Sequence, residues 1–80
     1  MERSEILKEV NDIFVDILEE EDIHLQDGTT AGDVAGWDSL SHIQLVVAIE
    51  KHFRIRFTSR EIQSWANVGE MITTIAGKIA

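Results

Sequence analysis

The sequence predicts an all-α fold, a four-helix bundle of three long helices and one short one, with a long loop between the first two helices. Apolar residues recur at helical spacing in three separate segments. Residues typical of helix starts precede each of the later helices. Proline is absent, and the strongest turn signals cluster between Asp27 and Gly36, where the long loop is expected.

The first helix is predicted from Arg3 to Glu20. Acidic residues and Lys8 separate its apolar positions, which are Ile6, Leu7, Val10, Ile13, Phe14, Ile17 and Leu18. The acid-rich stretch from Glu19 to Asp22 opposes the negative end of the helix dipole and favours termination there.

The segment from Glu21 to Trp37 is predicted to be a loop without regular structure. Asp27-Gly28 and Gly32-Asp33 suit turns, and the apolar residues that can hold the loop on the core are Ile23, Leu25 and Val34. A loop of this length is uncommon in a small domain and is often functional.

The second helix is predicted to start at Asp38, a good N-cap, and to run to about Phe53. One apolar stripe is assigned to the core and consists of Leu45, Val46, Ile49 and Phe53. A second stripe is displaced round the helix and consists of Leu40, Ile43 and Val47. This second stripe is either buried or an exposed docking surface, and periodicity alone does not separate the two.

Two further helices complete the prediction. Thr58 and Glu61 form a capping box for a short helix that ends near Trp65. Asn67 and Glu70 mark the start of the last helix, whose apolar face carries Met71, Ile72, Ile75, Ala76 and Ile79. The linker residues Ile55 and Phe57 alternate with arginines like a strand, but a single strand has no partner.

Composition limits the possible functions. The 80 residues, 44% of them hydrophobic, are expected to form one domain over positions 1–80. The absence of cysteine excludes a disulfide, a thiolate metal site and a cysteine nucleophile. The charged N-terminus lacks an apolar signal core and no apolar run approaches membrane-spanning length, so we expect a cytoplasmic protein without membrane insertion.

The charge is large and unevenly distributed. A net charge of −8 argues against nucleic acid as a partner and favours basic protein surfaces. Residues 1–38 hold twelve acidic against two basic residues, whereas residues 39–80 hold three acidic against five basic residues. A partner that docks near Ser39 therefore meets a different field from one that docks on the first helix.

Ser39 is the main candidate for chemistry. It lies in the first turn of a helix, where free backbone N–H groups and the dipole favour a bound phosphate, and Asp38 can help hold a metal ion during phosphoryl transfer. The simpler interpretation is an N-cap followed by a helix-compatible serine. Asp38, Ser39 and His42 share one helical turn and cannot easily build a catalytic relay. We therefore expect no catalytic residue. The histidines show no metal-ligand spacing, and we interpret them as surface or cap residues.

The chain resembles the acyl carrier protein family over nearly its whole length. The resemblance rests on Gly36-Trp37-Asp38-Ser39-Leu40, the helix from Ser41 to Phe53, the short capped helix and the first and last helices. It implies that Ser39 is esterified by 4′-phosphopantetheine from coenzyme A, through a phosphopantetheinyl transferase and Mg²⁺. The arm's thiol would hold acyl groups as thioesters, in a chain that has no cysteine of its own.

The resemblance also implies roles for the neighbours of Ser39. Asp38 would support the transferase reaction, and Val34 and Trp37 would shape the loop side of the site, with a plain packing role equally open for Trp37. The apolar part of the partner-docking surface would be Leu40, Ile43 and Val47. The polar positions of that surface would be Gln44, Glu50 and Lys51.

One departure from the family suggests a specialised member. Carriers of fatty acid synthases have a strongly acidic second helix, whereas only Glu50 is acidic among its three matching positions here. We therefore expect a monomeric carrier of a specialised fatty acid, polyketide or related pathway, served by acyl-loading and acyl-processing enzymes. The alternatives are a peptidyl or aminoacyl carrier, and an unmodified helical interaction module.

Overall fold

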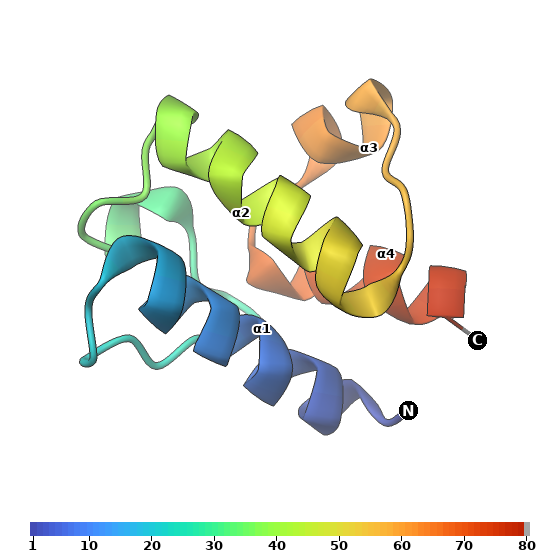
Figure 1. Cartoon of the computed structure of the whole chain (residues 1–80), viewed down its shortest axis with the longest axis horizontal. Helices are drawn as coiled ribbons and strands as arrows, with labels where there is room; N and C mark the ends of the chain where they lie inside the picture. Colours follow the sequence, from blue (N-terminus) through green and yellow to red (C-terminus); the bar gives the residue numbers. More distant parts are fainter. Residues whose placement is uncertain (80) are drawn as a thin grey trace.

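The computed structural model describes residues 1–79 and shows the predicted helical architecture. Its elements are α1 (Arg3–Leu18), the short 3₁₀ helix η1 (Ala31–Asp33), α2 (Ser39–Phe53), α3 (Ser59–Ser64) and α4 (Val68–Ile79). Helices α1 and α2 run in opposite directions side by side, and α4 also packs on α1 (Figure 1). The prediction of three long helices and one short one is confirmed.

The core lies where α1, α2 and α4 meet, and the long loop closes one part of it. Its buried members are Ile6, Val10, Phe14, Ile23, Leu25, Leu45, Ile49, Val68, Met71, Ile72 and Ile75. Each such side chain contributes roughly 1.5–3 kcal/mol through removal from water. The predicted core stripe of α2 is confirmed, because Leu45, Val46 and Ile49 are buried and Phe53 packs against the cluster.

Helix α1 ends two residues earlier than predicted. Its last helical residue is Leu18, and Glu19 takes a left-handed conformation with φ of 54°. The Glu19 backbone N–H donates to the Val15 carbonyl, which closes the last turn. The acidic residues from Glu19 to Asp22 therefore lie outside the helix, and only Glu19, at the C-cap, stays next to its negative end.

The sequence analysis predicted an irregular loop after α1, but part of this loop is regular. It contains η1, whose start is closed by a capping box between Thr30 and Asp33; the Thr30 backbone N–H donates to the Asp33 carboxylate over 2.9 Å. The Asn11 side chain of α1 holds the preceding part, donating to the Ile23 carbonyl and accepting from the Leu25 N–H. Side-chain capping thus makes a short helical turn where periodicity gives no signal.

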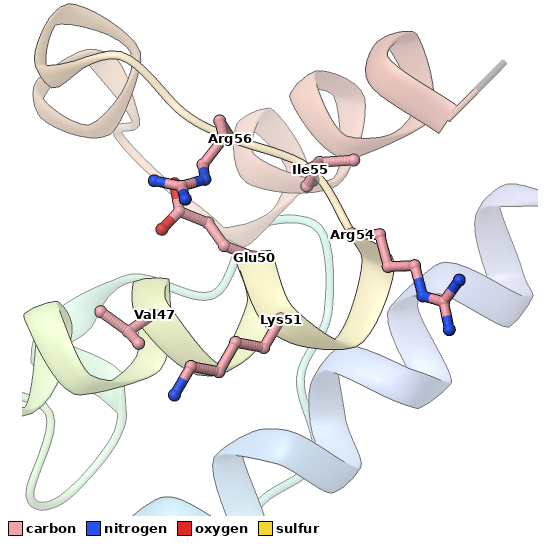
Figure 2. A pocket seen from close by; sticks show the side chains of 6 residues that line it. All are labelled: Val47, Glu50, Lys51, Arg54, Ile55 and Arg56. Carbon is pink, nitrogen blue, oxygen red and sulfur yellow. The ribbon is translucent and has the colours of Figure 1, made fainter.

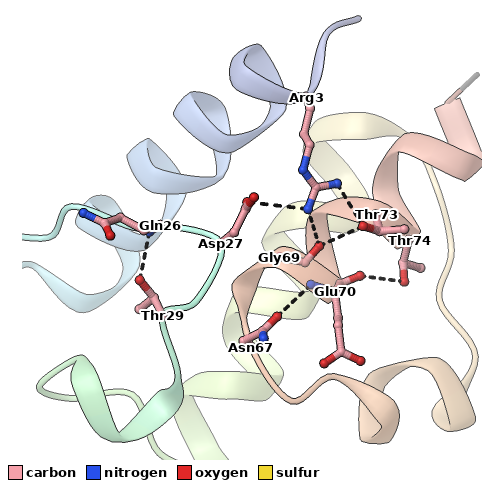
Figure 3. A network of polar contacts seen from close by, with 9 residues as sticks. All are labelled: Arg3, Gln26, Asp27, Thr29, Asn67, Gly69, Glu70, Thr73 and Thr74. Atoms are coloured by element: carbon pink, nitrogen blue, oxygen red, sulfur yellow. Dashed lines mark hydrogen bonds and ion pairs between the residues drawn. The ribbon is translucent and has the colours of Figure 1, made fainter.

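Helix α4 begins against the same loop. Its first free backbone donors, on Val68 and Gly69, bond to the carbonyls of Thr29 and Asp27 over 2.8 Å each. The Arg3 guanidinium of α1 donates to the Gly69 carbonyl over 2.8 Å and also bonds the Thr73 hydroxyl (Figure 3). This network joins the N-terminus, the loop and α4.

The short helix α3 and its flanking linkers follow the prediction. Thr58 caps α3 and exchanges hydrogen bonds with Glu61 in the predicted capping box. The Trp65 indole N–H donates to the Thr74 hydroxyl over 3.0 Å and so ties the end of α3 to α4. Residues 1–79 contain no strand. None of the helices in this range has the length and apolar character that a membrane crossing requires.

Candidate functional site

The start of α2 lies at the end of the molecule away from both termini (Figure 1). Ser39 is the first residue of α2 and its side chain is exposed. Asp38 is the N-cap, as predicted, and its carboxylate accepts a hydrogen bond from the Ser41 N–H over 2.9 Å. The loop therefore turns into the helix at a defined point and presents the Ser39 hydroxyl to solvent.

Ser41 occupies a contrasting position on the same helical turn. It is the buried polar residue of this region, and its hydroxyl accepts from the Asp38 N–H and donates to the Gly36 carbonyl, each over 2.8 Å. Gly36 has a φ of 86°, a conformation that glycine adopts without steric cost. Ser41 is thus committed to holding the loop, and Ser39 is the free hydroxyl of this turn.

The Asp38 carboxylate is held in its ionised form. The hydrogen bond from the Ser41 backbone N–H lowers the pKa of Asp38, outweighing the smaller opposing effect of desolvation. The side chain remains exposed beside Ser39. A fixed anionic carboxylate next to a free hydroxyl suits a reaction in which a metal ion accompanies a phosphate.

An open hollow of about 600 Å³ lies beside Ser39, between the loop, α2 and α3. Its lining residues are Ala31, Trp37, Asp38, Ser39, His42 and Gln63. The sequence prediction missed Ala31, His42 and Gln63 at this site. The spacing from Ser39 to His42, three residues on one helix, was the available signal for His42. Nothing local in the sequence brings Ala31 or Gln63 to this place.

His42 lies between two tryptophans, so its interpretation as a plain surface or cap residue is wrong. The Trp37 indole N–H donates to His42 Nδ1 over 3.1 Å, and the two rings stack with centroids 6.0 Å apart. The Trp65 ring meets His42 edge-on at 6.2 Å. Because Nδ1 accepts this bond, the neutral ring carries its proton on Nε2. Burial lowers the pKa of His42 and favours the neutral form.

Trp37 also has a packing role. Its ring meets the buried Phe14 of α1 edge-to-face, with centroids 4.8 Å apart. Val34 is half-buried against the core, next to the loop residues that precede Trp37. Both residues expected on the loop side of the site therefore connect it to the core.

The second apolar stripe of α2 faces solvent. Leu40, Ile43 and Val47 expose 70%, 63% and 43% of their surfaces. Periodicity had left this stripe open between core and docking surface, and the packing of α2 leaves it uncovered within residues 1–79. Three exposed apolar residues in a row beside an exposed serine form a surface that a partner can cover.

The polar residues expected to take part in docking differ from one another in exposure. Gln44 and Lys51 are exposed on the same helix as the apolar stripe. Glu50 is half-buried, and its carboxylate accepts the Phe57 backbone N–H over 2.8 Å. Glu50 is therefore partly engaged in holding the linker after α2.

The site does not assemble a catalytic relay. The Asp38 carboxylate bonds to Ser41, and His42 Nδ1 accepts from Trp37, so these hydrogen bonds do not join Asp38 to His42. A serine protease-like arrangement needs the base to contact both the nucleophile and its orienting acid.

Comparisons with known proteins agree with this geometry. Residues 8–75 match a sequence family described as a phosphopantetheine attachment site. The fold is similar to the solution NMR structure of a holo acyl carrier protein from Geobacter metallireducens, with a TM-score of 0.87 and 35% sequence identity. The match covers 92% of this chain and 85% of that chain. No protein in the curated set of sequences matches this chain.

Proposed function

This chain belongs to the phosphopantetheine-attachment family of acyl carrier proteins, and on that basis we propose that Ser39 is its attachment residue. A member of this family is a non-catalytic carrier whose phosphopantetheine arm is covalently attached. In the proposed attachment, the Ser39 oxygen forms a bond to the coenzyme A phosphorus that bears the pantetheine. The pyrophosphate P–O bond at that phosphorus breaks, adenosine 3′,5′-bisphosphate leaves, and the hydroxyl proton passes to a base of the transferase or to water. The arm supplies a thiol that holds cargo as a thioester.

The observation that carries this assignment is the contrast between Ser39 and Ser41. Ser39 is exposed beside the ionised Asp38 and an open hollow of about 600 Å³, whereas Ser41 is buried and fully bonded. Because the Ser39 side chain is exposed, we expect a phosphodiester there to displace no packed side chain. Asp38 is the residue we assign to support of the transferase reaction, through its fixed carboxylate.

We assign partner docking to Leu40, Ile43 and Val47, with Gln44, Glu50 and Lys51 at the polar positions. The partners are a phosphopantetheinyl transferase and enzymes that load and process acyl groups. The scarcity of acid along α2 supports a specialised fatty acid, polyketide or related pathway. A cytoplasmic, monomeric carrier remains our prediction.

Incubation with coenzyme A, Mg²⁺ and a broad-specificity phosphopantetheinyl transferase tests the attachment residue. We expect intact mass spectrometry to show the addition of one phosphopantetheine group to the wild type and none to Ser39→Ala. Ser59→Ala is a matched control, because Ser59 is also an exposed first residue of a helix, following the Thr58 cap of α3. This variant should be modified like the wild type.

Two outcomes would overturn the assignment. The first is the absence of any mass gain in folded wild-type protein. The second is a gain that persists in Ser39→Ala, which would place the group on another residue. A folded protein that stays unmodified would support the interaction-module alternative.

A further inference from the structure

The end of α2 and the linker after it form a second hollow, of about 560 Å³. Its lining residues are Val47, Glu50, Lys51, Arg54, Ile55 and Arg56 (Figure 2). Val47 and Ile55 supply apolar surface to it. Because Val47 is also the last member of the exposed stripe that begins at Leu40, the hollow continues the surface that leads away from Ser39.

The charge of this hollow is positive on balance. Lys51, Arg54 and Arg56 contribute three cations, and the ion pairs found within residues 1–79 involve none of them. Glu50 supplies the one carboxylate of the lining, and it accepts the Phe57 N–H over 2.8 Å. In Figure 2 the side chains of Lys51 and Arg54 extend in different directions, which spreads the charge along the rim.

The helix dipole does not account for all three cations. Lys51 lies in the last turn of α2 and Arg54 is its C-cap, so both benefit from the negative end of the helix. Arg56 lies two residues beyond the C-cap, in the linker, where the dipole has little effect. The cluster therefore exceeds what stabilisation of α2 requires.

We propose that this hollow, which has three cations and the single carboxylate of Glu50 in its lining, docks an acidic surface of a partner enzyme. The inference rests on the proposed function, in which Ser39 presents cargo to enzymes. The apolar stripe and two of the cations follow one another at helical spacing and span about 20 Å along the axis of α2. In order, these residues are Leu40, Ile43, Val47, Lys51 and Arg54. An enzyme that receives the arm at Ser39 and covers the apolar stripe meets the cations with the same surface.

A protein partner fits this hollow better than an anionic membrane. The whole chain carries a net charge of −8, and residues 1–38 hold twelve acidic against two basic residues. A flat anionic bilayer faces the field of the whole molecule, whereas an acidic patch on an enzyme contacts only this end. The exposed Val47 adds an apolar contact beside the partner's carboxylates.

A peptide titration tests this proposal on carrier that has first been loaded at Ser39 and checked by intact mass. Two synthetic amphipathic helical peptides share one leucine face, and one is flanked by glutamates and the other by lysines. We expect the glutamate peptide to shift the NMR amide signals of Val47, Lys51 and Ile55. The glutamate peptide should bind about tenfold more tightly than the lysine peptide, because three exposed charge pairs together can supply that difference in affinity. Its affinity should fall as salt is added.

Charge reversal supplies the matched variants. Lys51→Glu/Arg54→Glu/Arg56→Glu should reverse the peptide preference, whereas Arg60→Glu, at an exposed arginine of α3 outside the hollow, should retain it. Circular dichroism checks that each variant is folded. If the glutamate variant unfolds, the corresponding glutamine variant should abolish the preference without reversing it.

Several results would overturn the docking proposal. These are equal binding of the two peptides, retention of the preference in the glutamine variant, or tighter binding to vesicles of phosphatidylglycerol and phosphatidylcholine than to the glutamate peptide. Failure of the proposed function is seen separately, as absence of the mass gain at Ser39. A loaded carrier without peptide preference contradicts the docking proposal alone.

Discussion

At the scale of single residues, two serines on one helical turn have different tasks. Ser39 is exposed and free for modification, whereas Ser41 holds the loop through bonds to Asp38 and Gly36. The difference follows from the direction of the Asp38 cap, which brings position 41 back over the loop and leaves position 39 outside. Sequence type alone would not distinguish the two hydroxyls.

The Ser41→Ala substitution should destabilise the protein by about 1–2 kcal/mol, because the Asp38 N–H and the Gly36 carbonyl lose the hydrogen bonds that the buried hydroxyl makes to them. The free energy of unfolding from urea denaturation measures this effect. Phosphopantetheine addition at Ser39 should also become slower in this variant, because the loop that positions Ser39 loosens. Ser59→Ala, at an exposed serine, should change stability by less than about 0.5 kcal/mol. Equal stabilities of the two variants would contradict the role given to Ser41.

His42 gives a pH prediction at the same scale. Burial lowers its pKa in the folded protein, so its contribution to stability is present above the ordinary histidine pKa of about 6.5 and is lost as the pH falls through the folded value. Protonation of Nδ1 also breaks the bond from Trp37. Tryptophan fluorescence of the folded protein should therefore change in one step below pH 6.5 or so.

Two histidine variants check this assignment. The step should disappear in His42→Gln and persist in His24→Gln, because His24 is exposed on the loop. Persistence of the step in His42→Gln would show that another group causes it.

At the scale of elements, the long loop is held by the helices that it contacts. Asn11 of α1 bonds to Ile23 and Leu25, and the first backbone donors of α4 bond to Asp27 and Thr29. The loop in turn carries η1 and one wall of the hollow beside Ser39. A change in α4 can therefore reach the site through the loop backbone.

Two glycines of α4 test this connection. A Cβ on Gly69 would lie 2.8 Å from the Asp27 carbonyl oxygen, which is backbone, so Gly69→Ala should destabilise the protein by about 1–3 kcal/mol. A Cβ on Gly77 meets nothing within 4 Å, so Gly77→Ala should stabilise it by up to about 1 kcal/mol through helix propensity. Thermal unfolding of both variants measures the difference. A neutral Gly69→Ala would mean that the loop moves away from α4 at little cost.

At the scale of the whole molecule, acidic and basic charges occupy different parts of the chain. The first 38 residues are strongly acidic, whereas the segment from Lys51 to Arg60 is basic. Exposed charges of this kind mainly control association rates and the choice of partner. We therefore expect this charge distribution to affect the choice of partner more than the proposed attachment at Ser39.

The condensing enzymes of general fatty acid synthases meet acidic carriers through a basic surface. Such an enzyme should process acyl groups on this carrier at least about tenfold more slowly than on its own carrier. The measured quantity is kcat/KM at low salt. Gln44→Glu/Lys51→Glu should recover part of the rate, whereas Lys8→Glu, on α1, should not. Equal efficiency of the enzyme with both carriers would contradict the specialised assignment.

The sequence predicted well what depends on neighbours in the chain. The Asp38 cap, the capping box of Thr58 and Glu61 and the buried face of α2 all arise from spacings within a few residues. It predicted less well where local hydrogen bonds override periodicity, as at the side-chain capping box of η1 and at the backbone bond of the left-handed Glu19 that ends α1. Both features depend on local hydrogen bonds that a hydrophobic pattern does not record.

The sequence by itself determined the helices, their core faces, and a serine at the start of α2 in a pattern that resembles the acyl carrier family. Only the tertiary structure decided that Leu40, Ile43 and Val47 are exposed, because exposure depends on which elements pack on α2. The same holds for the placement of His42 between Trp37 and Trp65. These contacts join residues from the loop, α2 and the end of α3, and no local spacing specifies how such elements meet.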